Sequence, residues 1–127
     1  MKEIIKTSSG AAAIGPYSKI VKAGNTVYFS GTIALDNSGN LIQDSLEAET
    51  TQVMENIKNL LADAKLDFSH VVKCSIFLSD MGHFSTVNEI YARYFTGDFP
   101  ARETVAVAGL PKGANVEISI TAYTAND

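Results

Sequence analysis

Apolar residues at every second position mark the last part of the chain as a β-strand with one buried face. The pattern runs over residues 116–123. Its apolar side comprises Val116, Ile118, Ile120 and Ala122. The alternating positions are Glu117, Ser119, Thr121 and Tyr123. This strand is therefore expected to turn one face to a core and the other, which carries Glu117, away from it.

Further segments rich in β-branched and aromatic residues predict more strands. They are residues 3–7, 17–23, 26–31, 71–78 and 104–107. Gly24-Asn25 between the second and third predicts a two-residue hairpin turn. Small residues and Gly15-Pro16 predict a loop over residues 8–16. Residues 71–78 are almost continuously apolar, so we expect that strand to be covered on both faces.

A helical period of apolar residues predicts one long helix in the middle of the chain. Its apolar stripe comprises Leu46, Thr50, Val53, Met54, Ile57, Leu60, Leu61 and Ala64. The helix starts at Asp44 or Ser45, and Asp44 with Glu47 has the spacing of a capping box. The charged residues outside the stripe are expected on a solvated face. They are Glu47, Glu49, Glu55 and Lys58.

A second helix is predicted over residues 81–94, with Asp80 as its N-terminal cap. Its inward side chains are expected to be Phe84, Val87, Ile90, Tyr91 and Tyr94. Asn88 lies on this helix, one turn beyond Phe84. Pro111-Lys112-Gly113 then predicts a turn before the last strand, because proline presets one turn residue and glycine tolerates a positive φ.

The order of these elements predicts the fold class. Strand, hairpin, helix, strand, helix, strand, strand is typical of an α+β fold in which one mixed sheet carries two helices on one face. Residues 1–127 fit a single domain of this kind. The other face of the sheet is expected to be apolar enough to need a partner, and a homo-oligomer supplies one most simply.

Composition narrows the class of partner and compartment. The chain has 127 residues and a formal net charge of -4, with no basic stripe of the kind that nucleic acid requires. Its single cysteine, Cys74, excludes a disulfide within the chain and fits a reducing compartment. We find no leader sequence and no apolar run long enough for a membrane span, so we expect a cytoplasmic protein.

Metal and thiol chemistry find no support in the sequence. His70 and His83 are the only histidines, and they do not combine with Cys74 into a metal-binding spacing. Both histidines are expected to be surface or capping residues. Cys74 lies in the middle of an apolar strand, so we expect a small buried hydrophobe rather than a nucleophile.

Five polar residues at the edges of elements remain as candidates for a site. They are Tyr17, Ser30, Asn88, Arg102 and Glu117. Each has an ordinary structural interpretation when taken alone; Arg102, for example, could pair with Glu103 on the surface. If the strands at 104–107 and 116–123 pair, Arg102 can come near Glu117 in only two ways. Either the sheet brings the distant ends of these strands together, or the Arg102 comes from a neighbouring chain.

Five motifs in register along the chain add a resemblance. They are Ala-Ile-Gly-Pro-Tyr-Ser at 13–18, Val-Tyr-Phe-Ser-Gly at 27–31, Phe-Ser-Thr-Val-Asn at 84–88, Phe-Pro-Ala-Arg at 99–102 and Leu-Pro-Lys-Gly-Ala-Asn-Val-Glu-Ile at 110–118. Together they resemble the RidA family, also called the YjgF family. The resemblance implies a chorismate-mutase-like fold and a homotrimer around a central β-barrel, with ligand clefts between subunits.

The resemblance also implies an activity and a set of residues. Members hydrolyse reactive enamine and imine acids such as 2-iminopropanoate and 2-iminobutanoate to 2-oxo acids and ammonia, which needs no cofactor and no metal. Arg102 would clamp the substrate carboxylate, since a guanidinium matches a carboxylate bidentately. Glu117 would hold and polarise the attacking water. The other substrate-binding positions would be Tyr17, Ser30, Gly31, Asn88 and Thr104.

Three departures from the family pattern and two alternative functions accompany this interpretation. Ser119 stands where a second acid is common, Thr104 stands where a cysteine is common, and the loop over residues 94–99 is short.

The same cleft could act as a non-catalytic sensor of 2-oxo acids, although simple carboxylate binding has no use for Glu117. The family has also been linked to RNA cleavage and inhibition of translation, against which the acidic charge counts.

Overall fold

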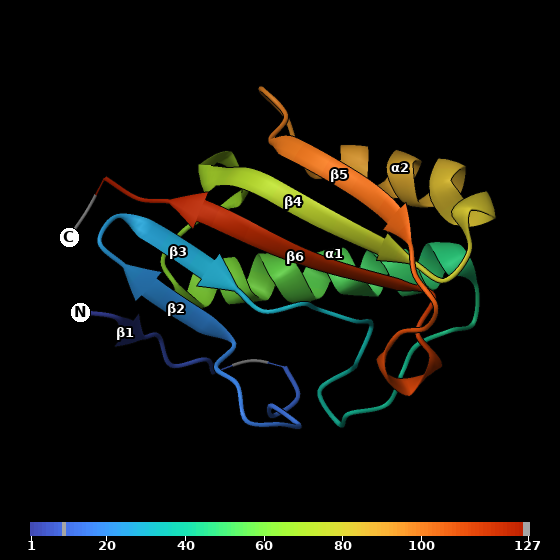
Figure 1. The fold of residues 1–127 in the computed structure, drawn as a ribbon, viewed down its shortest axis with the longest axis horizontal. Helices are drawn as coiled ribbons and strands as arrows, with labels where there is room; N and C mark the ends of the chain where they lie inside the picture. The colour runs from blue at the N-terminus through green and yellow to red at the C-terminus, as the bar shows by residue number, and fades with distance from the viewer. Residues whose placement is uncertain (9, 126–127) are drawn as a thin grey trace.

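A mixed sheet of six strands carries both helices on one face (Figure 1). The computed structural model describes residues 1–8 and 10–125; Ser9, within the loop expected at 8–16, lies outside the described residues. The strands are β1 (Glu3–Ile4), β2 (Ile20–Ala23), β3 (Thr26–Phe29), β4 (Val71–Leu78), β5 (Ala101–Ala106) and β6 (Val116–Tyr123). The helices are α1 (Leu46–Asp63) and α2 (Phe84–Ala92). The predicted α+β class is confirmed.

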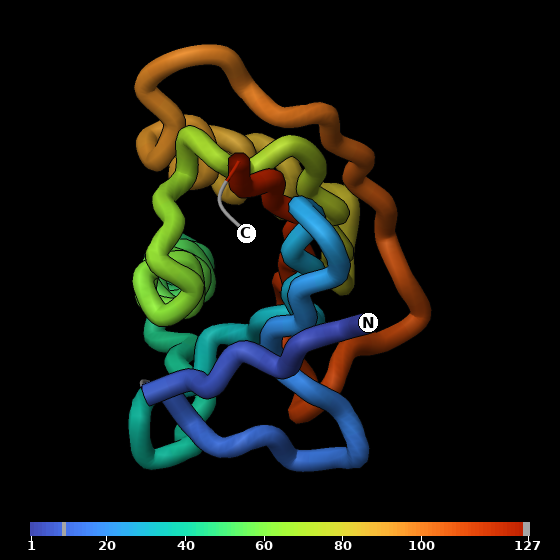
Figure 2. The backbone as a smooth tube through the Cα atoms, turned by 90° about the vertical axis from the view of Figure 1, so that its left-hand side faces the viewer, coloured from blue at the N-terminus to red at the C-terminus, as the bar shows by residue number. Residues whose placement is uncertain are grey.

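The strand order is β1-β2-β3-β6-β4-β5, and only β4 and β5 run parallel. The helix α2 connects these two strands, as a parallel pair requires. The strand β4 lies between β5 and β6, so the two strands that carry Arg102 and Glu117 are not neighbours. Viewed at 90° to Figure 1, the two helices lie together on one side of the sheet (Figure 2).

Strand register decides which face each residue occupies. Cys74 and Ile76 of β4 are buried against the helices, and Arg102 and Thr104 lie directly across from them on β5. Residues opposite each other on neighbouring strands point to the same face, so Arg102 and Thr104 face the helices. Glu117 lies across from Phe77, on the alternate set of positions. Glu117 therefore faces the open side of the sheet.

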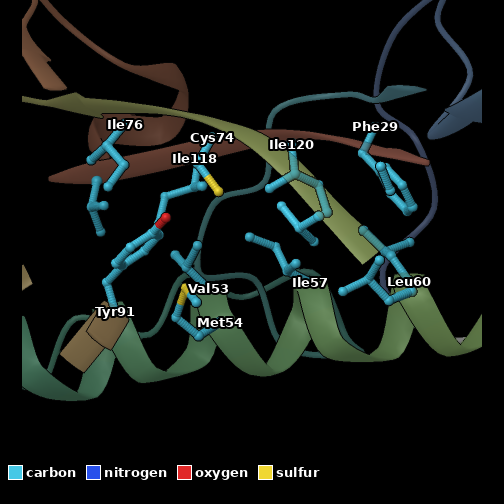
Figure 3. Packing of buried hydrophobic residues seen from close by; sticks show 14 of the residues in the cluster. Phe29, Val53, Met54, Ile57, Leu60, Cys74, Ile76, Tyr91, Ile118 and Ile120 are labelled. Carbon is cyan, nitrogen blue, oxygen red and sulfur yellow. The ribbon is translucent and has the colours of Figure 1, made fainter. Parts of the chain in front are cut away.

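The core lies between this sheet and α1. Figure 3 shows Val53 and Ile57 of α1 packed beneath Ile118 and Ile120 of the sheet, and Leu60 on the side of Phe29. The apolar stripe predicted for the helix and the buried face predicted for β6 thus meet. Cys74 belongs to the same cluster and is 1% exposed, which confirms it as a buried hydrophobe. Burial raises the pKa of its thiol.

The start of α1 agrees with one of the two expected residues. Ser45 is the N-cap, and its Oγ accepts from the Ala48 amide at 3.0 Å, so the cap is Ser45 rather than Asp44 of the expected capping box. Glu49, expected in solvent, is completely buried. Its carboxylate accepts from the Asn115 backbone at 2.8 Å and from the Asn115 side chain at 2.9 Å. A buried charge requires such partners, so Glu49 fastens the start of β6 to the helix.

The second helix begins as predicted, in two parts. Asp80 accepts from the Gly82 amide at 2.7 Å and caps a 3₁₀ turn, Met81–His83, which leads into α2. His83 precedes α2 without a side-chain capping bond. His70 is a capping residue, as expected, because its Nδ1 accepts from the Asp67 amide at 3.1 Å.

The open face of the sheet carries both apolar and charged side chains. Exposed Tyr28, Val105 and Tyr123 lie in strands β3, β5 and β6, but the ion pair of Lys73 and Glu103, with 2.9 Å between Nζ and Oε1, lies between them. In β4 the residues Val72 and Lys73 are exposed and Ser75 and Phe77 are half-buried, so the prediction that the strand is covered on both faces is wrong for this chain by itself. No helix in the described part of the chain is long and apolar enough to cross a membrane.

Candidate active site

A cavity of about 330 Å³ opens where β3 ends, beside the loops at the lower edge of Figure 1. Four of the residues singled out from the sequence line it: Tyr17, Ser30, Gly31 and Glu117. They come from the loop before β2, the end of β3 and the start of β6. The structure therefore brings together side chains that lie up to a hundred positions apart in the chain.

Backbone pairing places these residues. The Ser30 amide donates to the Lys19 carbonyl at 2.9 Å and its hydroxyl to the Ser18 carbonyl at 2.7 Å, which continues the hairpin past β3. Thr32 then exchanges two backbone hydrogen bonds with Ile118 at 2.8 and 3.0 Å. This exchange lays the chain at Gly31 directly against Glu117 of β6.

Gly31 is required by the closeness of this contact. A Cβ added there would lie 2.2 Å from Glu117 Oε2 and 2.8 Å from its carboxyl carbon. Carbon and oxygen atoms do not approach so closely, so any larger residue has to displace the carboxylate. Gly31 thus serves to seat Glu117, and its backbone is the surface against which the carboxylate rests.

Burial of Glu117 changes its acidity. The carboxylate is half-buried, and removal from water raises its pKa above the usual value for a glutamate. Among the described residues no positive group offsets this shift. A carboxylate of this kind is a better proton acceptor than an exposed one, which is the property that a general base needs.

Arg102 is held at a second location, between β5 and α2. Its Nη1 donates to Asn88 Oδ1 at 2.7 Å. The guanidinium carbon lies 5.1 Å from the ring centre of Tyr91 and 5.7 Å from that of Phe84, in cation–π range. The sequence patterns predicted both rings to face inward, which is right for the buried Tyr91 and wrong for Phe84, which is exposed. They did not predict that the rings would support an arginine. The guanidinium is thereby fixed with most of its donors uncommitted.

Ion pairing with Glu103 does not occur. Glu103 points to the open face and pairs with Lys73, so the ordinary interpretation of Arg102 as a surface ion pair is wrong. Within the described residues no carboxylate pairs with Arg102. Thr104 shares the face of Arg102, and its hydroxyl oxygen is buried with no hydrogen-bond partner in the described part of the chain.

The candidate residues therefore form two groups. Tyr17, Ser30, Gly31 and Glu117 line the cavity, and Asn88, Arg102 and Thr104 gather between β5 and α2. The register places Arg102 and Glu117 on opposite faces of the sheet, with β4 between their strands. Residues missed by sequence reasoning also line the cavity, among them Lys19, Asn56, Asn59 and Leu60. No motif singled these out as site residues, and Leu60 was predicted only as part of the apolar stripe of the helix. The described residues contain no group of His, Cys, Asp and Glu that could hold a metal ion.

Comparisons with known proteins agree with this architecture. The family profile described as Endoribonuclease L-PSP matches residues 7–124. Protein DfrA of Myxococcus xanthus is 48% identical over 126 residues, which cover 97% of this chain and 96% of that protein. The 2-iminobutanoate/2-iminopropanoate deaminase of Mus musculus is 44% identical over 123 residues, covering 96% and 91%. The solved structure of YyfA, a conserved Rid family protein of Yersinia pestis, matches with a TM-score of 0.93 at 41% identity, covering 98% and 100%.

The fold defines a small α+β protein of the Rid type, with one mixed sheet and two helices on one of its faces. The chain belongs to the family described as Endoribonuclease L-PSP, and the RidA resemblance of its motifs is confirmed.

Proposed function

We propose that this protein hydrolyses 2-imino acids, such as 2-iminopropanoate and 2-iminobutanoate, to 2-oxo acids and ammonia. The observation that carries the proposal is the half-buried Glu117, whose carboxylate rests on Gly31 in the cavity and has a raised pKa. Binding a small carboxylic acid requires a cation but no base. Relatives that share more than two-fifths of the sequence, such as the mouse protein, carry the name of this activity.

The working unit in this proposal is a homotrimer with clefts between its subunits. Arg102 and Glu117 occupy opposite faces of one sheet, so a substrate cannot touch both within one chain. A second copy can bring its Arg102 to the cavity that holds Glu117, which makes the partner copy part of the site. The exposed aromatic and aliphatic side chains on the open face give the copies apolar surface to bury. The reaction runs in the cytoplasm in this proposal.

Hydrolysis then follows from the positions of the two groups. Arg102 binds the α-carboxylate with its free donors and so fixes the imine carbon. Glu117 accepts a proton from a water molecule while the oxygen of that water bonds to the imine carbon. The electrons of the C=N double bond move to the nitrogen. Glu117 next passes this proton to the nitrogen, which gives a carbinolamine. It then takes the proton of the carbinolamine hydroxyl and delivers it to the same nitrogen, so that the C–N bond breaks as C=O forms and ammonia leaves. The balance is imine plus water giving 2-oxo acid plus ammonia, which uses no cofactor.

The remaining residues orient the reactants. Tyr17 and the Ser30 hydroxyl line the cavity near Gly31, whose backbone amide can donate to the substrate. Asn88 holds the guanidinium of Arg102 in place. The buried hydroxyl of Thr104, on the same face as Arg102, is available to the bound carboxylate.

The direct test measures ammonia and 2-oxo acid from imines that an amino-acid oxidase generates in the assay, with and without the protein. We expect the protein to accelerate the release of both products in equal amounts. If the protein binds 2-oxobutanoate but leaves the rate of imine hydrolysis unchanged, it is a 2-oxo acid sensor and not a deaminase.

Replacement of Gly31 by alanine should cost activity without unfolding the protein. The new methyl group displaces the Glu117 carboxylate, and misplacing a catalytic group by about 1 Å costs on the order of 10²-fold in rate. Gly97→Ala is the matched control, because nothing lies within 4 Å of the added Cβ there. Thermal melting and kcat/KM are measured on both variants. A Gly31→Ala protein with the parent kcat/KM would show that Glu117 need not rest on this glycine.

Association of three chains is expected in solution at micromolar concentration. Sedimentation equilibrium or light scattering should give three times the mass of the chain, because the open sheet face and the divided site both require neighbouring copies. A stable monomer that hydrolyses imines at the full rate would contradict the intersubunit cleft.

A further inference from the structure

The cavity that holds Glu117 also holds an ammonium group, that of Lys19. Lys19 is half-buried, and its Nζ donates to the Ala11 carbonyl of the loop before β2. An ammonium carries three donors, and within the described part of the chain this contact uses one of them, which leaves hydrogen-bonding capacity toward the cavity. Within the described residues no carboxylate lies within ion-pair distance of Lys19.

Lys19 and Glu117 lie at separate places in the cavity. The Lys19 carbonyl accepts from the Ser30 amide, and the next residue, Gly31, contacts Glu117. Two strand spacings therefore separate the two backbones, which is roughly 10 Å. Burial raises the pKa of Glu117, and no ammonium offsets that rise. Both side chains line the cavity, so a ligand bound in the cavity can contact each of them.

We propose that Lys19 is a specificity-determining residue that binds a second carboxylate, at the far end of the substrate. This inference rests on the proposed function and names its substrate class: 2-imino acids whose side chain ends in a carboxylate, such as 2-iminosuccinate and 2-iminoglutarate. In this arrangement Arg102 of a neighbouring copy binds the α-carboxylate, and Glu117 activates the water that attacks the imine carbon. Lys19 binds the carboxylate at the end of the side chain.

The walls of the cavity favour this pairing. Apolar side chains line it together with Lys19, among them Ile33 and Leu60, which are each 9% exposed. A charge pair formed in such surroundings is stronger than one in bulk solvent. An uncharged side chain gains nothing from the ammonium, so Lys19 discriminates between the two kinds of substrate rather than raising affinity for both.

A role for Lys19 only in holding the loop is the alternative that an experiment has to separate. The loop has another attachment, since the Ser8 hydroxyl donates to Asp63 Oδ1 of α1 at 2.8 Å. Replacing Lys19 therefore leaves one end of the loop fastened. Loss of the loop would harm every substrate alike, whereas loss of a carboxylate contact would harm only the dicarboxylates.

The test compares Lys19→Met and Lys19→Arg with the parent on imines generated from glutamate and from 2-aminobutanoate. Lys58→Met is the matched control, since Lys58 is exposed on α1 and is not among the residues lining the cavity. We expect Lys19→Met to lower kcat/KM for 2-iminoglutarate on the order of 10-fold, mainly through KM, and for 2-iminobutanoate by less than about 2-fold. Lys19→Arg should restore most of the loss. An equal loss on both substrates, or none on 2-iminoglutarate, would overturn the proposal.

Calorimetry separates this inference from the proposed function. Binding of 2-oxoglutarate and of 2-oxobutanoate is measured for the parent and for Lys19→Met, with no turnover involved. We expect the variant to bind 2-oxoglutarate more weakly than the parent does and to bind 2-oxobutanoate as the parent does. If that difference holds while no imine is hydrolysed, the deaminase proposal fails and the Lys19 site stands. If the parent does not bind 2-oxoglutarate, the Lys19 site is wrong.

Discussion

Arg102→Ala is expected to lower kcat/KM for 2-iminobutanoate by roughly 10²-fold or more. The guanidinium is fixed by Asn88 and by the rings of Phe84 and Tyr91, and no carboxylate in the described residues occupies it. Without the guanidinium the imine carbon is no longer held in position for attack by the water, so both the affinity for the substrate and the rate of hydrolysis fall. Steady-state kinetics with thermal melting of the same preparations checks the prediction.

Two further variants sharpen this test. Arg102→Lys keeps the charge but not the planar fork, so it should recover only part of the activity. Arg93→Ala removes an arginine that pairs with Glu89 at 3.1 Å on the exposed side of α2, and it should leave the kinetics unchanged. If Arg102→Ala stays folded and associated yet works at the parent rate, the carboxylate clamp lies elsewhere.

Glu117→Gln is expected to reduce kcat on the order of 10²-fold or more while 2-oxo acid binding persists. The amide keeps the shape that rests on Gly31 but cannot accept the proton of the water. In the parent, burial raises the pKa of Glu117, so the acidic limb of its pH–rate profile should lie above the range of an ordinary glutamate. Normal turnover in Glu117→Gln would assign the base to another residue and favour the sensor.

The same variant has an expected effect on stability. Because the pKa of Glu117 is raised in the folded state, its contribution to stability is present at low pH and lost as pH rises through the folded pKa. Glutamine does not ionise, so Glu117→Gln should melt at a higher temperature than the parent at neutral pH. The difference should vanish below the pKa of the unfolded glutamate. Melting curves of the parent and of Glu117→Gln, measured at several pH values, show whether the buried carboxylate of Glu117 lowers the stability of the folded protein.

Alternation and helical period predicted the elements well where a single core face decides them. Residues 116–123 form β6 with the predicted bounds, and its four predicted inward residues are buried. Glu49 was placed wrongly because its charge was given more weight than its position, three residues after Leu46 and four before Val53 on the apolar side of α1. The Asn115 amide that binds its carboxylate comes from a distant segment. Contacts between distant segments leave no local pattern in a sequence.

The functional site shows the same difference between features that local patterns predict and features that depend on contacts between distant segments. Motifs predicted Arg102 and Glu117 through a resemblance, and residue types explained what each could do. Their placement on opposite faces of the sheet depends on β4 lying between β5 and β6, which follows from pairing across the whole chain. Lys19 was missed because a single lysine before a strand is ordinary, and only the cavity makes it distinctive.

Mixed trimers test the intersubunit site most directly. Arg102→Ala and Glu117→Gln proteins, each nearly inactive, are unfolded together in equal amounts and refolded so that their chains mix. An intact cleft then takes Arg102 from a Glu117→Gln chain and Glu117 from an Arg102→Ala chain, so random mixing should restore about a quarter of the parent rate. Each variant refolded alone should remain inactive. If the mixture shows no activity above the two variants alone, although mixed trimers have formed, Arg102 and Glu117 do not share a cleft between subunits and the account is wrong.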